Sequence, residues 1–133
     1  MVQCCGGGTR LIYTCAGGSD VGEITDRVAR KLDKDGYGKM YCLAGLGAQL
    51  SAFIASAKGA DENIVIDGCP VSCGKKIFEH AGIPCRYYVL TKMGLTKGQT
   101  PVTSEIVDKI VRDIRQSSQP LPSSETKNSC CGG

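Results

Sequence analysis

The chain has 133 residues, 41% hydrophobic and 22% charged, with a net charge of +3, which fits a single folded domain with one core. Aromatic residues make up only 5% of the chain, and no basic stripe is interleaved with them, so nucleic-acid binding has little support. No apolar stretch approaches the roughly 20 residues of a membrane-spanning helix, and the first residues lack the pattern of a secretory signal, so we expect a cytoplasmic protein.

The first third of the chain predicts a strand followed by a helix. Residues 11–15 form an apolar run that is typical of a buried strand. After two glycines, Ser19 or Asp20 can cap a helix, because each offers a side-chain oxygen to the free amides of the first turn. Apolar residues then recur at helical spacing as far as Leu32. Gly36 ends this helix, since glycine adopts the left-handed conformation at low cost.

The middle of the chain predicts two further strands with a helix between them. Residues 39–43 form a weaker strand, residues 44–48 a glycine-rich turn, and residues 49–57 a helix of small residues. Residues 63–67 are β-branched and apolar, as in a strand that is covered on both faces.

The last part of the chain predicts two helices around a fourth strand. Pro70 suits the first position of a helix, because the amide it lacks would have no partner there, and this helix ends near Gly82. Residues 86–90 form the fourth strand. A glycine-containing loop follows, and Thr103 or Ser104 caps a final helix.

Alternating strands and helices indicate a parallel sheet with right-handed crossovers. We therefore predict a small three-layer Rossmann-like α/β domain with four helices and a mainly parallel four-stranded sheet, whose strand order stays open. This domain spans residues 10–116. Residues 1–9 form a flexible Cys/Gly-rich N-terminus, and the Ser- and Pro-containing residues 117–133 are predicted to be disordered.

Nine cysteines stand out in a chain expected in a reducing compartment, where metal binding or redox chemistry explains them better than disulfides. Cys15, Cys42 and Cys69 end three of the predicted parallel strands, so they share the edge at which open α/β folds bind ligands. Cys73 lies four residues after Cys69, on the same face of the predicted helix. Four thiolates suit zinc or an iron–sulfur cluster.

Other residues near this edge have supporting roles. Asp67, Ser19 and Asp20 are expected to make hydrogen bonds around the ligands, and Asp67 is equally suited to cap the following turn. Lys92 and Lys97 lie in the loop after the fourth strand, on the same edge, where they can screen the thiolates, hold an anionic ligand or only face solvent. Cys85 precedes the fourth strand at the opposite edge and is expected to be a structural thiol.

The remaining cysteines form two similar terminal pairs, each followed by two glycines. They are suited to relay metal or are merely exposed thiols, and the sequence leaves both possibilities open. The pairs are Cys4-Cys5 and Cys130-Cys131.

Three blocks of the chain resemble a family that is named for its DGC motif and described as zinc-binding. The blocks are YTCAGGSDVG at residues 13–22, YCLAGLG at residues 41–47 and DGCPVSCGKK at residues 67–76. The resemblance covers roughly residues 10–115 and implies that the shared thiols are those of Cys15, Cys42, Cys69 and Cys73. It implies no particular reaction.

Three functions follow as hypotheses. The first is a protein that binds a metal ion, zinc above all, through the four thiolates, for metal handling or sensing. The second is a thiol- or sulfur-transfer or redox enzyme, with Cys69 as nucleophile and Cys73 as resolving thiol. The third is an iron–sulfur protein. The residues leave open whether the chain is an enzyme, and they point to no protein partner.

Overall fold

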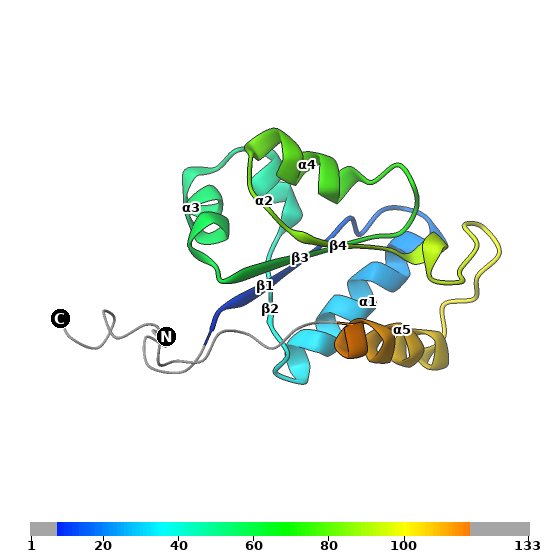
Figure 1. The fold of residues 1–133 in the computed structure, drawn as a ribbon. Helices are drawn as coiled ribbons and strands as arrows, with labels where there is room; N and C mark the ends of the chain where they lie inside the picture. Colours follow the sequence, from blue (N-terminus) through cyan, green and yellow to red (C-terminus); the bar gives the residue numbers. More distant parts are fainter. Residues whose placement is uncertain (1–7, 118–133) are drawn as a thin grey trace.

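The computed structural model describes residues 8–117 of the chain (Figure 1). The predictions for the terminal segments, including the two cysteine pairs, lie outside these residues. Four strands form one sheet in the order β2-β1-β3-β4, and all neighbouring pairs are parallel, which confirms the α/β prediction and supplies the strand order. The strands are β1 (Arg10–Thr14), β2 (Lys39–Met40), β3 (Glu62–Asp67) and β4 (Arg86–Val89).

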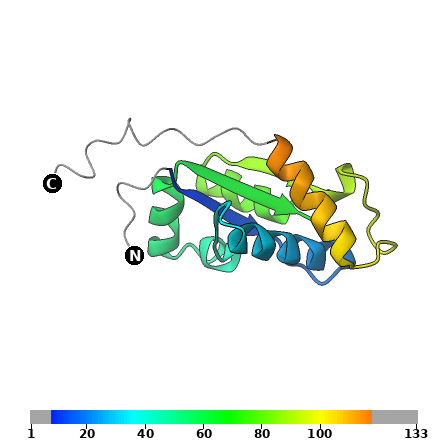
Figure 2. The ribbon, with the colours of Figure 1, turned by 90° about the horizontal axis from the view of Figure 1, so that it is seen from below.

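Helices cover both faces of the sheet and make three layers (Figures 1 and 2). The helices α1 (Asp20–Lys34) and α5 (Ser104–Ser117) lie side by side on one face. The other face carries α2 (Leu43–Gly47), α3 (Ser51–Gly59) and α4 (Cys73–Ala81). Because successive strand residues point to opposite faces, Ile12 packs with α1 and α5, whereas Leu11 and Tyr13 pack under the other three helices.

Two helices begin where capping residues were predicted. The Ser19 Oγ accepts a hydrogen bond of 3.1 Å from the amide of Gly22 at the start of α1. The Thr103 Oγ1 accepts one of 3.3 Å from the amide of Ile106 at the start of α5. Each oxygen satisfies an amide that has no partner within its helix, which is why these residue types mark the starts of helices.

The region between β2 and α3 differs from its prediction. The ladder of β2 holds only two residues, although the amide of Tyr41 still donates to the Ile12 carbonyl at 2.9 Å. The expected glycine turn is the short helix α2. Its glycines allow close packing, since a Cβ on Gly45 would lie 2.8 Å from the ring of Phe53. That contact offsets the poor helix propensity of glycine.

The helix predicted to start at Pro70 starts at Cys73 instead. The residue before it, Ser72, is left-handed with a φ of 60°, so the chain turns sharply between Cys69 and Cys73. The prediction that these two cysteines share one helix face was therefore wrong. The fourth strand also ends one residue early, and a single 3₁₀ turn, η1 (Leu90–Lys92), follows it.

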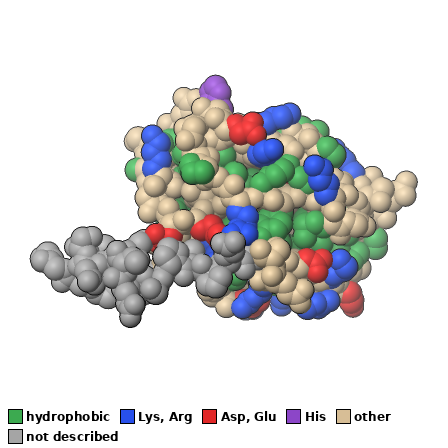
Figure 3. Space-filling view, in the orientation of Figure 1, with side chains coloured by type: hydrophobic (Ala, Val, Ile, Leu, Met, Phe, Trp, Pro, Cys, Tyr) green, Lys and Arg blue, Asp and Glu red, His purple; other side chains and the backbone are tan. Residues whose placement is uncertain are grey.

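Two features bear on the environment of the protein. None of the helices in the described part of the chain is long and apolar enough to cross a membrane. On the face shown in Figure 3, lysine and arginine side chains are dispersed among acidic and apolar ones instead of forming one continuous basic patch.

Candidate thiol site at the carboxyl edge of the sheet

The four predicted ligands lie on segments that leave the carboxyl ends of three neighbouring strands. Cys15 directly follows β1, Cys42 precedes α2, Cys69 lies two residues beyond β3, and Cys73 opens α4. Because the strands are parallel, these segments emerge at one edge of the sheet. Within residues 8–117, however, no three His, Cys, Asp or Glu side chains are grouped so that they could hold a metal ion. The common thiolate shell therefore stays a prediction.

Cys15 is held most closely by its surroundings. Its Sγ accepts a hydrogen bond of 3.4 Å from the amide of Gly68 and lies 3.8 Å from the Oγ1 of Thr25. The backbone turns immediately after it, with a φ of 46° at Ala16, whose amide donates to the same Thr25 oxygen at 3.3 Å.

Thr25 has a structural role here that the sequence interpretation missed. It is fully buried, and its hydroxyl donates to the Gly22 carbonyl at 2.6 Å while facing the turn after Cys15. The available signal was a hydroxyl-bearing residue on the otherwise apolar face of a predicted amphipathic helix, since a buried polar group needs partners.

The Asp-Gly-Cys segment has a separate structural reason for each of its first two residues. The carboxylate of Asp67 is almost fully buried and accepts hydrogen bonds from the amides of Gly74 and Lys75, at 2.9 and 3.0 Å. Asp67 therefore caps α4, which is the second of the roles expected for it. A Cβ on Gly68 would lie only 2.9 Å from the backbone of Val21, so glycine lets β3 end directly against the start of α1. This geometry fixes where Cys69 emerges.

Cys69 faces a positive charge brought by a distant loop. The Lys97 Nζ lies 3.6 Å from the Cys69 Sγ. Asp20 holds this loop, because its two carboxylate oxygens accept hydrogen bonds from the amides of Gly98 and Thr100 at 2.8 and 2.9 Å. These bonds keep the pKa of the Asp20 carboxyl below its ordinary value. Asp20 thus acts on the site through the loop, and Ser19 serves as a helix cap.

The other thiols differ in exposure. Cys42 and Cys73 are exposed, whereas Cys15, Cys69 and Cys85 are partly buried. Cys85 precedes β4 at the opposite edge of the sheet, as expected, and burial raises the pKa of its thiol. A hydrogen bond between the hydroxyl groups of Ser72 and Tyr87 also holds the loop between β3 and α4.

Comparisons with known proteins identify a family whose matched region contains these motifs. The family model of the DGC domain matches residues 11–114, which include all four edge cysteines. A protein of Pseudomonas aeruginosa, the "Anaerobic and virulence modulator AnvM", is 31% identical over 88 residues, which cover 65% of this chain and 67% of that protein. No solved structure matches the chain. The chain belongs to the DGC domain family.

Proposed function

We propose that this protein binds a soft metal ion, zinc above all, through Cys15, Cys42, Cys69 and Cys73. The observation that supports the proposal is their placement: all four lie on turns or helix starts at one edge of a parallel sheet. Thiolates at such an edge are the donors that zinc prefers. Buried structural cysteines would be expected in the strands themselves, whereas two of these four are exposed.

Two of the four sulfurs already lie beside polar groups, but metal binding would require side chains of the other two to move. The Cys15 Sγ accepts a hydrogen bond from the backbone amide of Gly68, and the Cys69 Sγ lies beside the Lys97 ammonium. Because Cys42 and Cys73 are exposed, their side chains are able to change rotamer without breaking the core. Metal would then draw four segments together, and loss of metal would release them. A site that assembles in this way suits metal handling or sensing.

The name of the relative supports a regulatory role over a housekeeping one. AnvM is named a modulator, and its name refers to anaerobic conditions. Thiolate sites respond both to metal supply and to oxidation. We therefore propose sensing of metal or redox state as the use to which the site is put in this chain.

The test is metal content and absorption spectrum of the untagged full chain, purified anaerobically. The four terminal cysteines are changed to serine beforehand, so that only the described thiols contribute. We expect one zinc per chain and no colour. The double variant Cys69→Ser, Cys73→Ser should lose the metal, and Cys85→Ser, which removes a thiol at the opposite edge, should retain it.

Other outcomes assign the site differently. Iron with sulfide and visible absorption would make this an iron–sulfur protein. A metal-free protein whose unfolding midpoint is unchanged by added zinc would contradict the metal proposal.

The contact between Lys97 and Cys69 favours a second candidate, a thiol–disulfide exchange enzyme. In this reaction the Cys69 thiolate attacks a substrate disulfide and forms a mixed disulfide, while the first substrate sulfur leaves as a thiolate. The Cys73 thiolate then attacks Cys69, which releases the second substrate thiolate and leaves a Cys69–Cys73 disulfide. The substrate is thus reduced by two electrons, and an external dithiol must reduce the enzyme again.

A further inference from the structure

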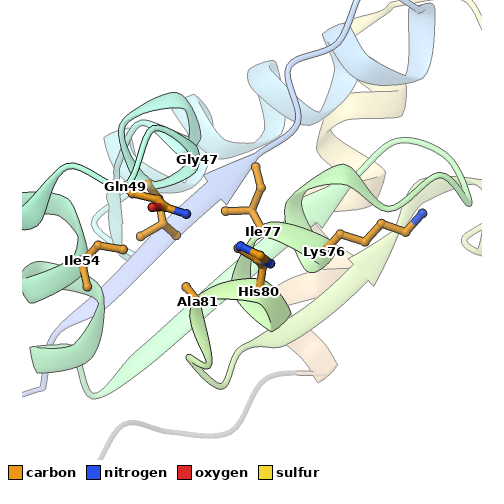
Figure 4. A pocket seen from close by; sticks show the side chains of 8 residues that line it. Gly47, Gln49, Ile54, Lys76, Ile77, His80 and Ala81 are labelled. Atoms are coloured by element: carbon orange, nitrogen blue, oxygen red, sulfur yellow. The ribbon is translucent and has the colours of Figure 1, made fainter.

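A pocket separate from the four edge thiols lies between α2, α3 and α4 (Figure 4). It has a volume of about 380 Å³, which falls in the range of small-molecule sites. None of the five cysteines that the structure describes lines it, so its function does not depend on the proposed metal site. Its lining consists of Leu46, Gly47, Gln49, Ile54, Lys76, Ile77, His80 and Ala81.

The pocket has an apolar floor and a polar rim. Leu46 is buried, and Ile54 on α3 and Ile77 on α4 are partly buried on opposite sides of the pocket (Figure 4). The rim residues Gln49 and His80 are exposed and come from facing sides of the pocket (Figure 4). This arrangement, apolar surface below a few polar groups, is the usual form of a site for a small molecule with one polar end.

The backbone at the rim is unusual as well. Gln49 has a φ of 61°, a left-handed conformation that non-glycine residues adopt at a cost. This turn connects α2 to α3, and Figure 4 shows that it directs the Gln49 amide toward α4. The strained residue is thus one of the polar groups that face the pocket.

The one formally charged side chain among the described lining residues, Lys76, indicates the polar end of the ligand. Lys76 lines the pocket with its stem, and its ammonium extends away along α4 (Figure 4). The four-carbon stem is flexible enough to return the charge to the mouth. Among residues 8–117, no acidic side chain lines the pocket, and the adjacent Glu79 pairs with Lys75 at 3.6 Å. An anionic group is therefore favoured over a cationic one.

From these observations we infer that the pocket binds a small carboxylic acid with an unbranched apolar chain. The volume offers room for roughly a dozen groups of the size of a water molecule, which suits a chain of about eight carbons. The chain lies on Leu46, Ile54 and Ile77, and the carboxylate faces Gln49, His80 and the returned Lys76 ammonium.

The test is titration of the full chain with octanoate, followed by methyl NMR and calorimetry. Methyl shifts should change at Leu46, Ile54 and Ile77 and stay constant at Ile110, in the core on the other face of the sheet. We expect a dissociation constant of about 1 mM or tighter, as roughly ten ligand atoms ordinarily give. Each methylene removed from the ligand should weaken binding about fourfold.

Variants separate the two ends of the ligand. Lys76→Gln combined with His80→Gln should weaken octanoate binding about two- to fivefold, whereas Lys34→Gln, on the opposite face, should leave it unchanged. Ala81→Phe should fill the pocket and abolish binding. If this variant unfolds, the change of affinity with ligand length, measured on the unmodified chain, still tests whether the apolar chain is bound. Octanol binding as tightly as octanoate, or methyl shifts unrelated to the pocket, would overturn the inference.

Discussion

At the scale of single residues, Asp67 shows how a motif residue can serve the site without touching it. Its carboxylate is buried, and the amides at the start of α4 donate hydrogen bonds to both of its oxygens. Gly74 must be small for this contact, because a Cβ there would lie 2.6 Å from Val65 and 3.0 Å from the Asp67 carboxylate. The Asp67 cap thus sets the position of Cys73, since that cysteine is the first residue of the helix.

The thiols should differ sharply in reactivity. Cys69 is partly exposed beside the Lys97 ammonium, whereas burial raises the pKa of Cys85. A raised thiol pKa means less thiolate at neutral pH, and the thiolate is the reactive form. We expect iodoacetamide to label Cys69 roughly tenfold faster than Cys85 at pH 7.5, as measured by mass spectrometry of metal-free protein.

Two lysine variants test the cause of that difference. Lys97→Gln should slow labelling of Cys69, and Lys92→Gln, a lysine earlier in the same connection, should not. Equal rates at Cys69 and Cys85 would count against both the contact with Lys97 and the thiol-exchange mechanism.

At the scale of elements, the connection from η1 to α5 is a loop anchored to a distant helix start. Asp20 opens α1, and its carboxylate binds the amides of Gly98 and Thr100, nearly eighty residues later in the chain. The same loop carries Lys97 to Cys69. The first turn of α1 therefore controls the environment of a thiol that follows β3.

Replacing Asp20 with asparagine should loosen this loop. Asparagine keeps the shape but loses the charge that strengthens both hydrogen bonds, so the amides of Gly98 and Thr100 should exchange hydrogen faster by NMR. Asp35→Asn, at the other end of α1, is the matched control and should have no effect. Unchanged protection at both amides in Asp20→Asn would contradict the anchoring role.

The stabilisation of this loop by Asp20 should depend on pH. The folded-state pKa of Asp20 is below its ordinary value, so its contribution is present above the unfolded-state pKa of about 4 and is lost as the pH falls through the lower, folded-state value. Amide protection at Gly98 should therefore persist through weakly acidic solution and fail only below that range.

Element boundaries could be predicted where a local signal sets them. Ser19 and Thr103 cap helices through their own side chains, and both starts were found from sequence. The start of α4 is set by Asp67, six residues earlier, and by a left-handed Ser72, so Pro70 was a misleading local signal. The short helix α2 was hidden for a similar reason, because Gly45 is explained by packing on Phe53 and Gly47 by packing on Ile77.

At the scale of the whole molecule, the parallel sheet and its layers could be predicted because they depend on periodicity along the chain. The edge that carries Cys15, Cys42 and Cys69 followed from the same reasoning. The hydrogen bonds of Thr25 did not, since they depend on tertiary packing, and for Lys97 the sequence left open whether it faces the thiols or only solvent. The pocket between α2, α3 and α4 was also beyond prediction, because one of its walls was expected to be a turn.

The opposite edge of the sheet has a network of charges that should stabilise the whole fold. Glu62 on β3 accepts hydrogen bonds from Arg10 on β1 at 2.7 Å and from Arg86 on β4 at 3.2 Å. Arg86 also donates to the Ser117 carbonyl at the end of α5, so residues far apart in the sequence meet here. The Glu62 side chain is only 16% exposed, which limits screening by solvent.

Replacing Glu62 with glutamine should therefore destabilise the protein as a unit. The two guanidinium groups would face each other across a neutral amide, and we expect the free energy of unfolding to fall by about 1–3 kcal/mol in urea titrations of the full chain. Glu79→Gln removes the partner of an exposed lysine and should change it by less than about 0.5 kcal/mol. A loss as small in Glu62→Gln as in Glu79→Gln would show that the network is no stronger than an ordinary surface pair. If the free energy of unfolding falls by the expected amount and its slope against urea concentration is unchanged, β1, β3, β4 and α5 unfold together.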